Sequence, residues 1–329
     1  MNDAPRTALI LGATGGIGFE MAQALSARGW RLRCLHRRPE LHAAEHPNWE
    51  WVPGDATEVE DVCAAAEGAQ LIVHAVNPPG YRSWSTLVPA MAEATAEAAR
   101  RHGADIFLPG TVYNFGPDAG LEPREDAPQN PLTRKGRIRV ELEARFREVA
   151  SPSTRVIILR AGDFFGAPGN GWLAEVMVKP GKPVGSVWAP GAAGVAHQWA
   201  YLPDMAETAV RLAERRDALE PFSRFHFRGH VDTSGREFAE AIRRVTGQPR
   251  LPVRRFPWAL TYLMAPFSET MREVLEMRYL WKTPLVMPND ALVRVLGAEP
   301  HTPLDVAMRA TLERLGCLPR TAPLAEAST

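Results

Sequence analysis

The sequence predicts an α/β protein with a doubly wound parallel sheet and a smaller, mostly helical C-terminal lobe. Three observations lead to this prediction. The apolar run Ala8–Leu11 ends in a glycine-rich turn, and a helical pattern follows. Apolar runs then alternate with helical patterns as far as residue 228, as parallel βα units do. From Asp232 onward that alternation fades.

The glycine-rich turn reads Gly-Ala-Thr-Gly-Gly-Ile-Gly over residues 12–18. Its first glycine permits a tight turn, its second lets the backbone approach a pyrophosphate, and its last lets the helix pack on the strand. The helix N-terminus offers free N–H groups and a partial positive charge to an anion. With a second strand at Arg31–Leu35, this context indicates dinucleotide binding rather than an ordinary βα turn. The residues expected at the cofactor are Gly12, Thr14, Gly15, Gly16, Ile17 and Gly18.

The end of the second strand predicts which dinucleotide binds. The chain there reads His-Arg-Arg-Pro, and the first acidic residue, Glu40, lies beyond the proline. An acid at this place usually bonds the ribose hydroxyls of NAD, whereas an arginine accommodates the 2′-phosphate of NADP. Arg37 and Arg38 therefore favour NADP, unless they form only a solvated basic turn.

Two further strand ends are expected beside the cofactor. Asp55 either bonds the adenine amino group or caps the helix Val59–Ala66, and Ala56 follows it. The fourth strand contains His74, which we interpret as a hydrogen-bonded core histidine. That strand reaches the edge of the sheet where ligands bind. The residues expected there are Ala75, Val76 and Asn77.

The remaining elements complete the chain. Strands are expected at Trp49–Val52, Gln70–Val76, Asp105–Leu108, Arg155–Leu159 and Phe225–Arg228, and helices at Leu87–His102, Thr133–Val149, Met205–Glu214, Thr233–Thr246 and Asp305–Leu315. Pro168–Gly194 is expected to be irregular. The aromatic-rich segment Phe256–Trp281 forms either a cap with an apolar pocket or plain core. We assign residues 1–165 and 198–230 to a dinucleotide-binding domain, 166–197 and 231–320 to a substrate lobe, and 321–329 to a disordered tail.

Composition excludes several classes of protein. The 38 basic and 38 acidic side chains balance, which argues against a nucleic-acid or anionic-membrane binder. No run reaches the ~18 apolar residues of a membrane span, and the N-terminus lacks the apolar core of a signal peptide. Cys34, Cys63 and Cys317 are far apart, without zinc-ligand spacing, and are expected to be buried. We therefore expect a cytoplasmic protein without a metal site.

Over nearly its whole length the chain resembles an extended short-chain dehydrogenase/reductase of the NAD(P)-dependent epimerase/dehydratase family. The resemblance rests on the glycine loop, Gly54-Asp55-Ala56, Val112-Tyr113 and residues 159–166 and 199–206, in that order. It implies a Rossmann domain followed by a substrate lobe. It also implies a Ser/Thr–Tyr–Lys set, with tyrosine and lysine four residues apart on a helix. In that set the tyrosine exchanges a proton with the substrate oxygen, and the lysine lowers the tyrosine pKa and holds the nicotinamide ribose.

The chain lacks this catalytic set. None of its five tyrosines is followed by a lysine four residues later. Lys135 stands where the resemblance places the tyrosine, Arg139 where it places the lysine, and Pro109 where it places the serine. The proton relay that the resemblance implies therefore cannot be carried over.

Four cations crowd the first turns of the expected helix: Arg134, Lys135, Arg137 and Arg139. Cations there oppose the helix dipole and one another, so NADP or an anionic substrate nearby would stabilise them. The crowding should lower the pKa of Lys135, which could then act as a general acid or base or form a Schiff base. Alternatively the side chains point into solvent and pair with Glu125, Glu141 and Glu143. Arg139 is expected to contact the cofactor ribose or phosphate.

Other candidates follow later strands. Tyr113 comes after the fifth strand, at the ligand-binding edge, with Thr111 beside it. Asp163 occupies a position where relatives use a polar residue near the substrate. His197 faces the substrate or makes a structural hydrogen bond, and Asp204 is expected to cap a helix.

These residues predict an NADP-dependent oxidoreductase that transfers a hydride to or from a carbonyl or alcohol carbon of a small organic substrate. The proton donor would be Lys135, Tyr113 or an ordered water. One alternative is an epimerase or dehydratase that retains its nucleotide and acts on a sugar-like substrate. Another is a non-catalytic NADP-binding sensor. A homodimer is possible, because helices that flank the sheet often pair in such families.

Overall fold

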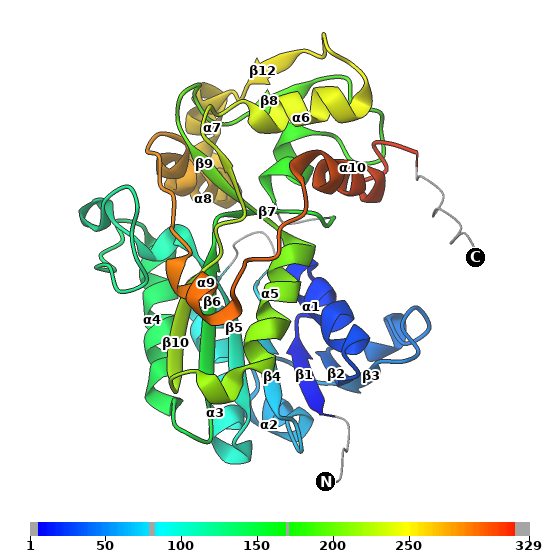
Figure 1. Cartoon of the computed structure of the whole chain (residues 1–329), viewed down its shortest axis with the longest axis vertical. Helices are drawn as coiled ribbons and strands as arrows, with labels where there is room; N and C mark the ends of the chain where they lie inside the picture. Colours follow the sequence, from blue (N-terminus) through cyan, green and yellow to red (C-terminus); the bar gives the residue numbers. More distant parts are fainter. Residues whose placement is uncertain (1–5, 79–82, 169–170, 320–329) are drawn as a thin grey trace.

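The computed structural model describes residues 6–78, 83–168 and 171–319. Its centre is a parallel sheet of seven strands in the order β10-β6-β5-β4-β1-β2-β3, with helices on both faces (Figure 1). The strands are β1 (Thr7–Leu11), β2 (Arg31–His36), β3 (Glu50–Pro53), β4 (Leu71–His74), β5 (Asp105–Thr111), β6 (Val156–Ala161) and β10 (Phe222–His226). The doubly wound fold predicted from the sequence is confirmed. The expected tail 321–329 lies outside the described residues.

Strand β1 explains how the sequence makes this sheet. Its side chains alternate, so that Ala8 and Ile10 join the core on one face, and Leu9 and Leu11 the core on the other. All four are fully buried, which is why the strand reads as a continuous apolar run. The covering helices are α1 (Gly16–Ala27) and α5 (Leu202–Glu214) on the first face, and α2 (Val59–Ala65), α3 (Trp84–His102) and α4 (Arg134–Val149) on the second.

A second lobe lies at the end of the molecule opposite the N-terminus (Figure 1). It contains a three-stranded sheet, β11-β9-β7, and a two-stranded sheet, β12-β8. Its strands are β7 (Asp163–Phe165), β8 (Val187–Ala189), β9 (His197–Tyr201), β11 (His230–Asp232) and β12 (Val253–Arg255). Its helices are α6 (Glu237–Thr246), α7 (Trp258–Met264), η7 (Ala265–Phe267), α8 (Glu269–Glu276), η8 (Met277–Trp281) and α10 (Leu304–Arg314), while α9 (Asp290–Leu296) packs against the large sheet.

Short elements depart from the sequence prediction. The sequence does not predict β9, and β10 begins three residues before the expected strand and is not the last one. The segment expected to be irregular contains a π-helical turn, Leu173–Met177, and β8, although residues 169–170 lie outside the described part. Strand β9, His-Gln-Trp-Ala-Tyr, lacks the continuous apolar run by which a buried strand such as β1 is recognised.

Asp204 does not cap α5, contrary to expectation. Tyr201 is the N-cap residue, and Asp204 lies in the first turn. Its carboxylate accepts hydrogen bonds from the backbone N–H of Thr302, at 2.6 Å, and from the hydroxyl of Thr302, at 2.7 Å. Asp204 therefore ties the segment before α10 to the helix that follows β9.

Candidate active site

The glycine loop has the shape that an approaching phosphate requires. Gly12 has a φ of +91°, and a Cβ atom on it would lie 2.6 Å from the carbonyl oxygen of Ala75. A Cβ atom on Gly18 would lie 2.1 Å from the carbonyl oxygen of Gly12. No side chain caps the N-terminus of α1, whose N-cap residue is Gly15. The bare backbone and the uncapped helix end fit a dinucleotide pyrophosphate.

The end of β4 lies directly against this loop, as the sequence predicts. The N–H of Ala75 donates to the carbonyl oxygen of Leu11 at 3.0 Å, which continues the pairing of β1 with β4. Ala75 and Val76 are half-buried, and Asn77 is exposed. These three residues and the glycine loop therefore share one edge of the sheet. Thr14 is exposed on the same loop.

At the end of β2 the basic pair is accessible. Arg37 and Arg38 are both exposed. The backbone N–H of Arg38 lies 3.1 Å from Nδ1 of His36, which bends the chain there. Glu40 lies in the short helix η1 (Pro39–Leu41), beyond this bend. Arg37 and Arg38 follow β2 directly, without an acidic residue before them, and both are accessible. They are therefore compatible with binding of the NADP 2′-phosphate.

Asp55 does not cap the following helix. Its Oδ1 accepts hydrogen bonds from the backbone N–H and the hydroxyl of Thr57, at 3.0 and 2.9 Å, and the N-cap residue of α2 is Glu58. The Asp55 carboxylate thus forms a turn with the residue two positions later, and its hydrogen bonds are made before the helix begins. Its other predicted role, a bond to adenine, stays a prediction. Ala56 is half-buried beside it.

Lys135 is fully buried at the start of α4. Thr133 is the N-cap residue, and its hydroxyl accepts the N–H of Gly136 at 2.9 Å. The Lys135 Nζ lies 2.9 Å from Oε2 of Glu273 and donates to the Glu273 carbonyl oxygen at 2.8 Å. Burial lowers the pKa of Lys135 below its ordinary value, and Glu273 opposes that shift. The alternative that Lys135 points into solvent is therefore wrong.

Two glutamates of α8 supply the anion that the basic cluster needs. Glu276 accepts the backbone N–H of Arg134 and that of Lys135, the latter at 3.3 Å, and Glu273 accepts from the Arg134 guanidinium. A carboxylate at a helix N-terminus is favourable, because it meets free N–H groups and the positive end of the dipole. Pairing of Lys135 with Glu125, Glu141 or Glu143 is not observed. The partner comes from the second lobe instead.

Glu143 has a different role. Its carboxylate forms a buried ion pair with Arg160 of β6, at 2.9 Å to Nε and 2.6 Å to the terminal nitrogen. It also accepts from the side-chain amide of Asn114 at 2.9 Å. This network fixes α4 against β6 and against the short helix η3 (Val112–Asn114). A bidentate, buried pair of this kind holds the start of α4 in place.

Arg139, one turn after Lys135, is 7% exposed and lies over the ring of Trp84, with 4.9 Å between Cζ and the ring centroid. Burial, with the Arg139 charge as a second cause, lowers the pKa of His74 to about 3. Nδ1 of His74 bonds the hydroxyl of Thr95 at 2.8 Å, so its interpretation as a satisfied core histidine is confirmed. Arg139 thus lies beside the end of β4, on the cofactor side of the sheet.

Tyr113 lies in η3, directly after β5. Its backbone N–H donates to the hydroxyl of Thr111 at 3.3 Å. The half-buried Tyr113 ring packs in an apolar cluster with Met277 and Leu280 of η8. A Cβ atom on Gly136 would lie 2.4 Å from the Tyr113 carbonyl oxygen, so the start of α4 is in close contact. The three predicted catalytic residues are therefore near neighbours.

Asp163 and His197, both predicted at the substrate, are in direct contact. Nε2 of His197 lies 2.6 Å from Oδ2 of Asp163, and Nδ1 lies 3.4 Å from the carbonyl oxygen of Leu280. The imidazole stacks on the Trp281 indole, with centroids 3.7 Å apart and planes at 10°. The structural hydrogen bond expected for His197 is confirmed. With both nitrogens engaged, His197 orients the Asp163 carboxylate.

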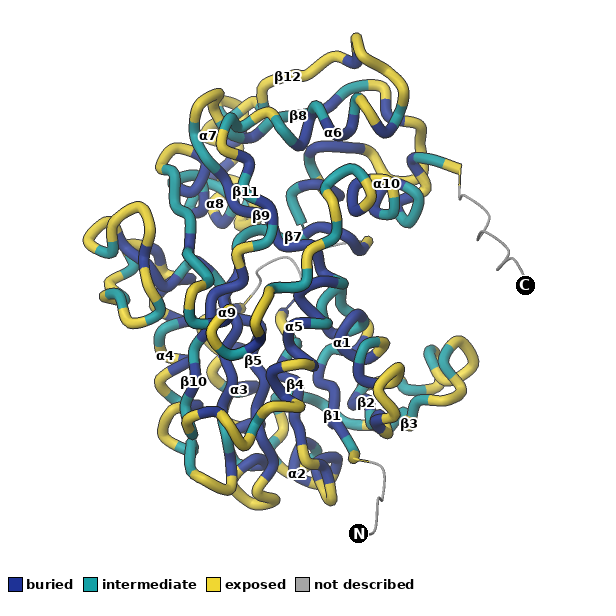
Figure 2. Tube along the Cα trace, viewed as in Figure 1, coloured by how far each residue is buried: buried dark blue, intermediate teal, exposed yellow. Residues whose placement is uncertain are grey.

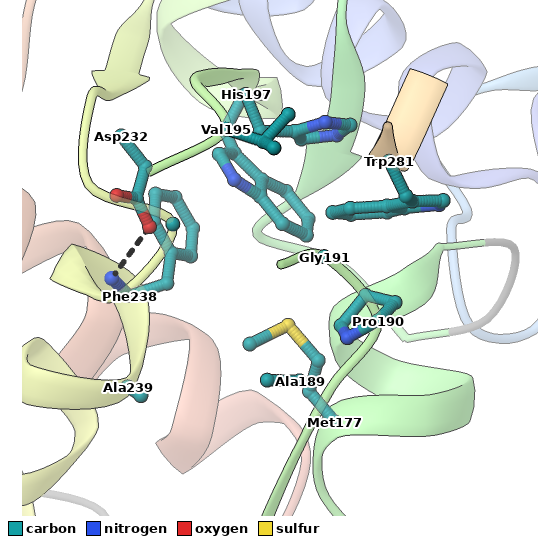
Figure 3. Close-up of a pocket in the computed structure, with 12 residues that line it drawn as sticks. Met177, Ala189, Pro190, Gly191, Val195, His197, Asp232, Phe238, Ala239 and Trp281 are labelled. Atoms are coloured by element: carbon teal, nitrogen blue, oxygen red, sulfur yellow. Dashed lines mark hydrogen bonds between the residues drawn. The ribbon is translucent and has the colours of Figure 1, made fainter. Parts of the chain in front are cut away.

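His197 and Trp281 also border an apolar pocket (Figure 3). Its other walls are Met177, Ala189, Pro190, Gly191, Val195, Trp199, Asp232, Gly235, Phe238 and Ala239. The Asp232 carboxylate accepts the N–H of Phe238 at 3.3 Å and so belongs to the start of α6. Within Phe256–Trp281 only Trp281 is among the residues that line this pocket, so the two interpretations of that segment, a cap with an apolar pocket or plain core, stay predictions.

Sequence reasoning missed the glutamates of α8 and one tyrosine beside them. Burial raises the pKa of Tyr279, and the Asp163 and Glu276 carboxylates add to the shift. Tyr279 therefore lies close to the Asp163 and Glu276 carboxylates. The spacing of Glu273 and Glu276 places them on one helical face, which is a signal that the sequence contains. That this face meets Lys135 is a long-range contact with no local signal.

Comparisons with known proteins agree with this geometry. A family model described as NAD(P)H-binding matches residues 12–162. The solved UDP-Glc/GlcNAc 4-epimerase of Campylobacter jejuni shares the fold, with a TM-score of 0.71 over 94% of this chain and 99% of that one, at 16% identity. The chain therefore carries an NAD(P)H-binding domain and has the fold of this epimerase.

Two further proteins are similar to this chain in sequence. The epimerase family protein SDR39U1 of Bos taurus is 23% identical over 263 residues, which are 73% of this chain and 81% of that protein. Ceramide reductase of Caulobacter vibrioides is 33% identical over 114 residues, or 32% of this chain. That match spans about a third, 35%, of the reductase. The resemblance inferred from the sequence, to an atypical member without the Tyr-x-x-x-Lys spacing, is confirmed.

Proposed function

We propose that this protein is an NADP-dependent oxidoreductase that transfers a hydride to or from a carbonyl or alcohol carbon of a small, apolar organic substrate. The observation that carries the proposal is the buried Lys135, held by Glu273 at the helix position where the resemblance places the catalytic tyrosine. A lysine whose pKa is lowered by burial releases its proton more readily and can act as a general acid or base.

The chemistry divides between cofactor and chain. Bound NADP(H) supplies or accepts the hydride at its nicotinamide ring. In the reductive direction Lys135 Nζ gives a proton to the carbonyl oxygen, so that the carbon gains a hydride and the oxygen a proton. In the oxidative direction Lys135 takes that proton back. Glu273 orients the ammonium, and Tyr113 and Thr111 line the approach from β5.

The cofactor-binding residues are assigned by their place on the sheet edge. The glycine loop and the N-terminus of α1 would hold the pyrophosphate, and Arg37 with Arg38 the 2′-phosphate. Arg139 would contact the nicotinamide ribose or a phosphate. Asp163, oriented by His197, would bond a polar group of the substrate. The choice of NADP over NAD rests on the two arginines.

The apolar pocket beside His197 supports an apolar substrate, since most of its lining residues are apolar, among them Trp199, Phe238 and Trp281. The match to a ceramide reductase supports a reductase. The fold shared with epimerases supports the alternative equally well, namely a nucleotide-retaining epimerase or dehydratase.

The purified protein and NADPH, mixed with a panel of apolar aldehydes and ketones, test the proposal. We expect substrate-dependent loss of NADPH absorbance with one alcohol formed per NADPH consumed. Isomerised product with no net loss of NADPH would favour the epimerase. NADPH binding without turnover of any carbonyl, together with unchanged cellular function when Lys135 and Tyr113 are both replaced, would favour the sensor.

A further inference from the structure

One face of the second lobe exposes an unusual number of apolar side chains. We call it the α7 face; it consists of β12, α7 and η7. Of the eleven large hydrophobic side chains exposed among the described residues, six lie on it: Val253 (40%), Leu260 (55%), Tyr262 (53%), Leu263 (67%), Met264 (44%) and Phe267 (84%). Exposed chain is visible along β12 and around α7 (Figure 2). Patches of this kind on a soluble fold mark an interaction surface.

Two arginines of β12, Arg254 and Arg255, belong to the α7 face, and three more precede it in the chain. Residues 241–268 contain five arginines and no acidic residue. Arg243 and Arg244 form ion pairs with neighbouring carboxylates of the lobe. Arg254 and Arg255 of β12 are exposed, and no carboxylate of the described residues pairs with them. The balanced net charge of the chain therefore conceals a local excess of positive charge beside the apolar patch.

We propose that the α7 face docks on the surface of a bilayer that contains anionic phospholipids. Leucine and aromatic side chains would enter the headgroup region while the arginines meet lipid phosphates. In the described part of the chain no helix is long and apolar enough to span a membrane, so the contact is with the surface. The inference revises our expectation that the chain avoids membranes, and it does not rest on the proposed reaction.

A second copy of the chain is a less favourable occupant. A two-fold symmetric interface places the same patch of both copies together. Arg254 and Arg255 of each copy would then share one interface with no carboxylate of the α7 face to offset them. Lipid phosphates offer the complementary charge.

Cosedimentation with vesicles tests the proposal. Vesicles of phosphatidylcholine with phosphatidylglycerol should bind the parent protein, and vesicles of phosphatidylcholine alone should bind it far less. The double variant Leu263→Glu/Phe267→Glu should lose at least about tenfold in affinity. Arg254→Glu/Arg255→Glu should lose roughly fivefold or more per arginine at low salt. Val306→Glu, at a site 58% exposed on α10, is the control and should bind like the parent.

Three outcomes would overturn the inference. The first is that the parent protein binds neutral and anionic vesicles equally well, and the second is that Val306→Glu loses as much vesicle affinity as the α7-face variants. The third is that the parent protein is a dimer, the α7-face variants are monomers, and vesicles bind neither of them. NADPH affinity, measured on every variant, checks folding. Because NADPH turnover is assayed separately, failure of docking and failure of the proposed reaction are distinguishable.

Discussion

The ammonium nitrogen of Lys135 lies 2.9 Å from Oε2 of Glu273, although the two residues are 138 positions apart in the chain. Lys135 begins a helix of the large sheet, and Glu273 belongs to α8 of the second lobe. Both side chains are almost completely buried. Breaking a buried ion pair by removing one partner leaves an uncompensated charge. The pair therefore links the candidate catalytic group to the contact between the lobes.

Replacing Lys135 by methionine should abolish turnover and leave NADPH affinity nearly unchanged. Loss of a general acid costs about 10²- to 10⁴-fold in kcat. Stopped-flow turnover and fluorescence titration with NADPH measure the two quantities. The exposed Lys182→Met serves as the control. Retained kcat in Lys135→Met would transfer the role to Tyr113 or to water.

Stability distinguishes a chemical role for Lys135 from a structural one. Lys135→Met should lower the free energy of unfolding by about 3–5 kcal/mol, because Glu273 stays buried without this partner. The double variant Lys135→Met/Glu273→Gln should regain part of that loss without regaining activity. Urea denaturation of both variants gives the comparison. Recovery of turnover in the double variant would contradict the assignment.

Arg37→Ala should remove the preference for NADPH. A charge-assisted hydrogen bond to phosphate contributes about 1.5–3 kcal/mol, so NADPH affinity should fall roughly 10- to 100-fold while NADH affinity hardly changes. Calorimetric titration with both nucleotides checks this. Arg31→Ala, at the opposite end of β2, is the matched control. Equal affinities for NADPH and NADH in the parent protein would refute the choice of NADP.

Gly18→Ala should weaken cofactor binding by at least about tenfold, because the new methyl would meet the Gly12 carbonyl oxygen at 2.1 Å and displace the loop. Gly185→Ala is a control of the same chemistry, since nothing lies within 4 Å of a Cβ atom there. The shift of Tm that NADPH causes is measured by thermal unfolding of both variants. A parent-like shift of Tm by NADPH in Gly18→Ala would contradict the phosphate assignment.

The protein should lose stability in mild acid. Burial lowers the pKa of His74 and of His226 to about 3, and that of His230 to about 4. Below their ordinary pKa of 6.5 the unfolded chain binds protons that the folded chain does not, so the unfolding free energy falls as pH falls. The slope is about 1.4 kcal/mol per pH unit for each group. In His226→Leu the unfolding free energy should fall less steeply between pH 6 and 4, by about the slope of one histidine. In the control His102→Leu, at an exposed site, the pH dependence should equal that of the parent protein.

Lys135 affects the stability of the protein at alkaline pH. Because its pKa is lowered in the folded state, the folded chain binds fewer protons than the unfolded chain just below pH 10.5. Stability should therefore rise with pH in that window, and Lys135→Met should remove the rise. Urea denaturation between pH 8 and 10.5 measures it.

Local patterns were sufficient for the cofactor half of the molecule. The spacing of Gly12, Gly15 and Gly18 acts through the backbone of a single turn, so a sequence can display it. The contact of Lys135 with Glu273 has no such local expression. It depends on how α8 lies over α4, and that is decided by packing of the second lobe. The cation cluster correctly indicated that an anion is needed, but the carboxylates expected to pair with it, Glu125, Glu141 and Glu143, are not the ones that provide it.

Strand β9 shows the same limit on the substrate side. Its residues mix polar and apolar side chains without a continuous apolar run, yet their pairing with β7 puts His197 within 2.6 Å of Asp163. Each of the two residues could be singled out separately. Their partnership, and the stacking on Trp281, required the fold.

At the first turn of α4, two cations, Arg134 and Lys135, meet two carboxylates, Glu273 and Glu276. The four charges cancel within the protein. A phosphate at this turn would find Arg134 and Lys135 already paired and would be repelled by the two carboxylates, while Arg137 and Arg139 lie further along the helix. An uncharged carbonyl compound meets no such barrier. We therefore expect this turn to favour an uncharged group, such as a carbonyl, over a phosphate.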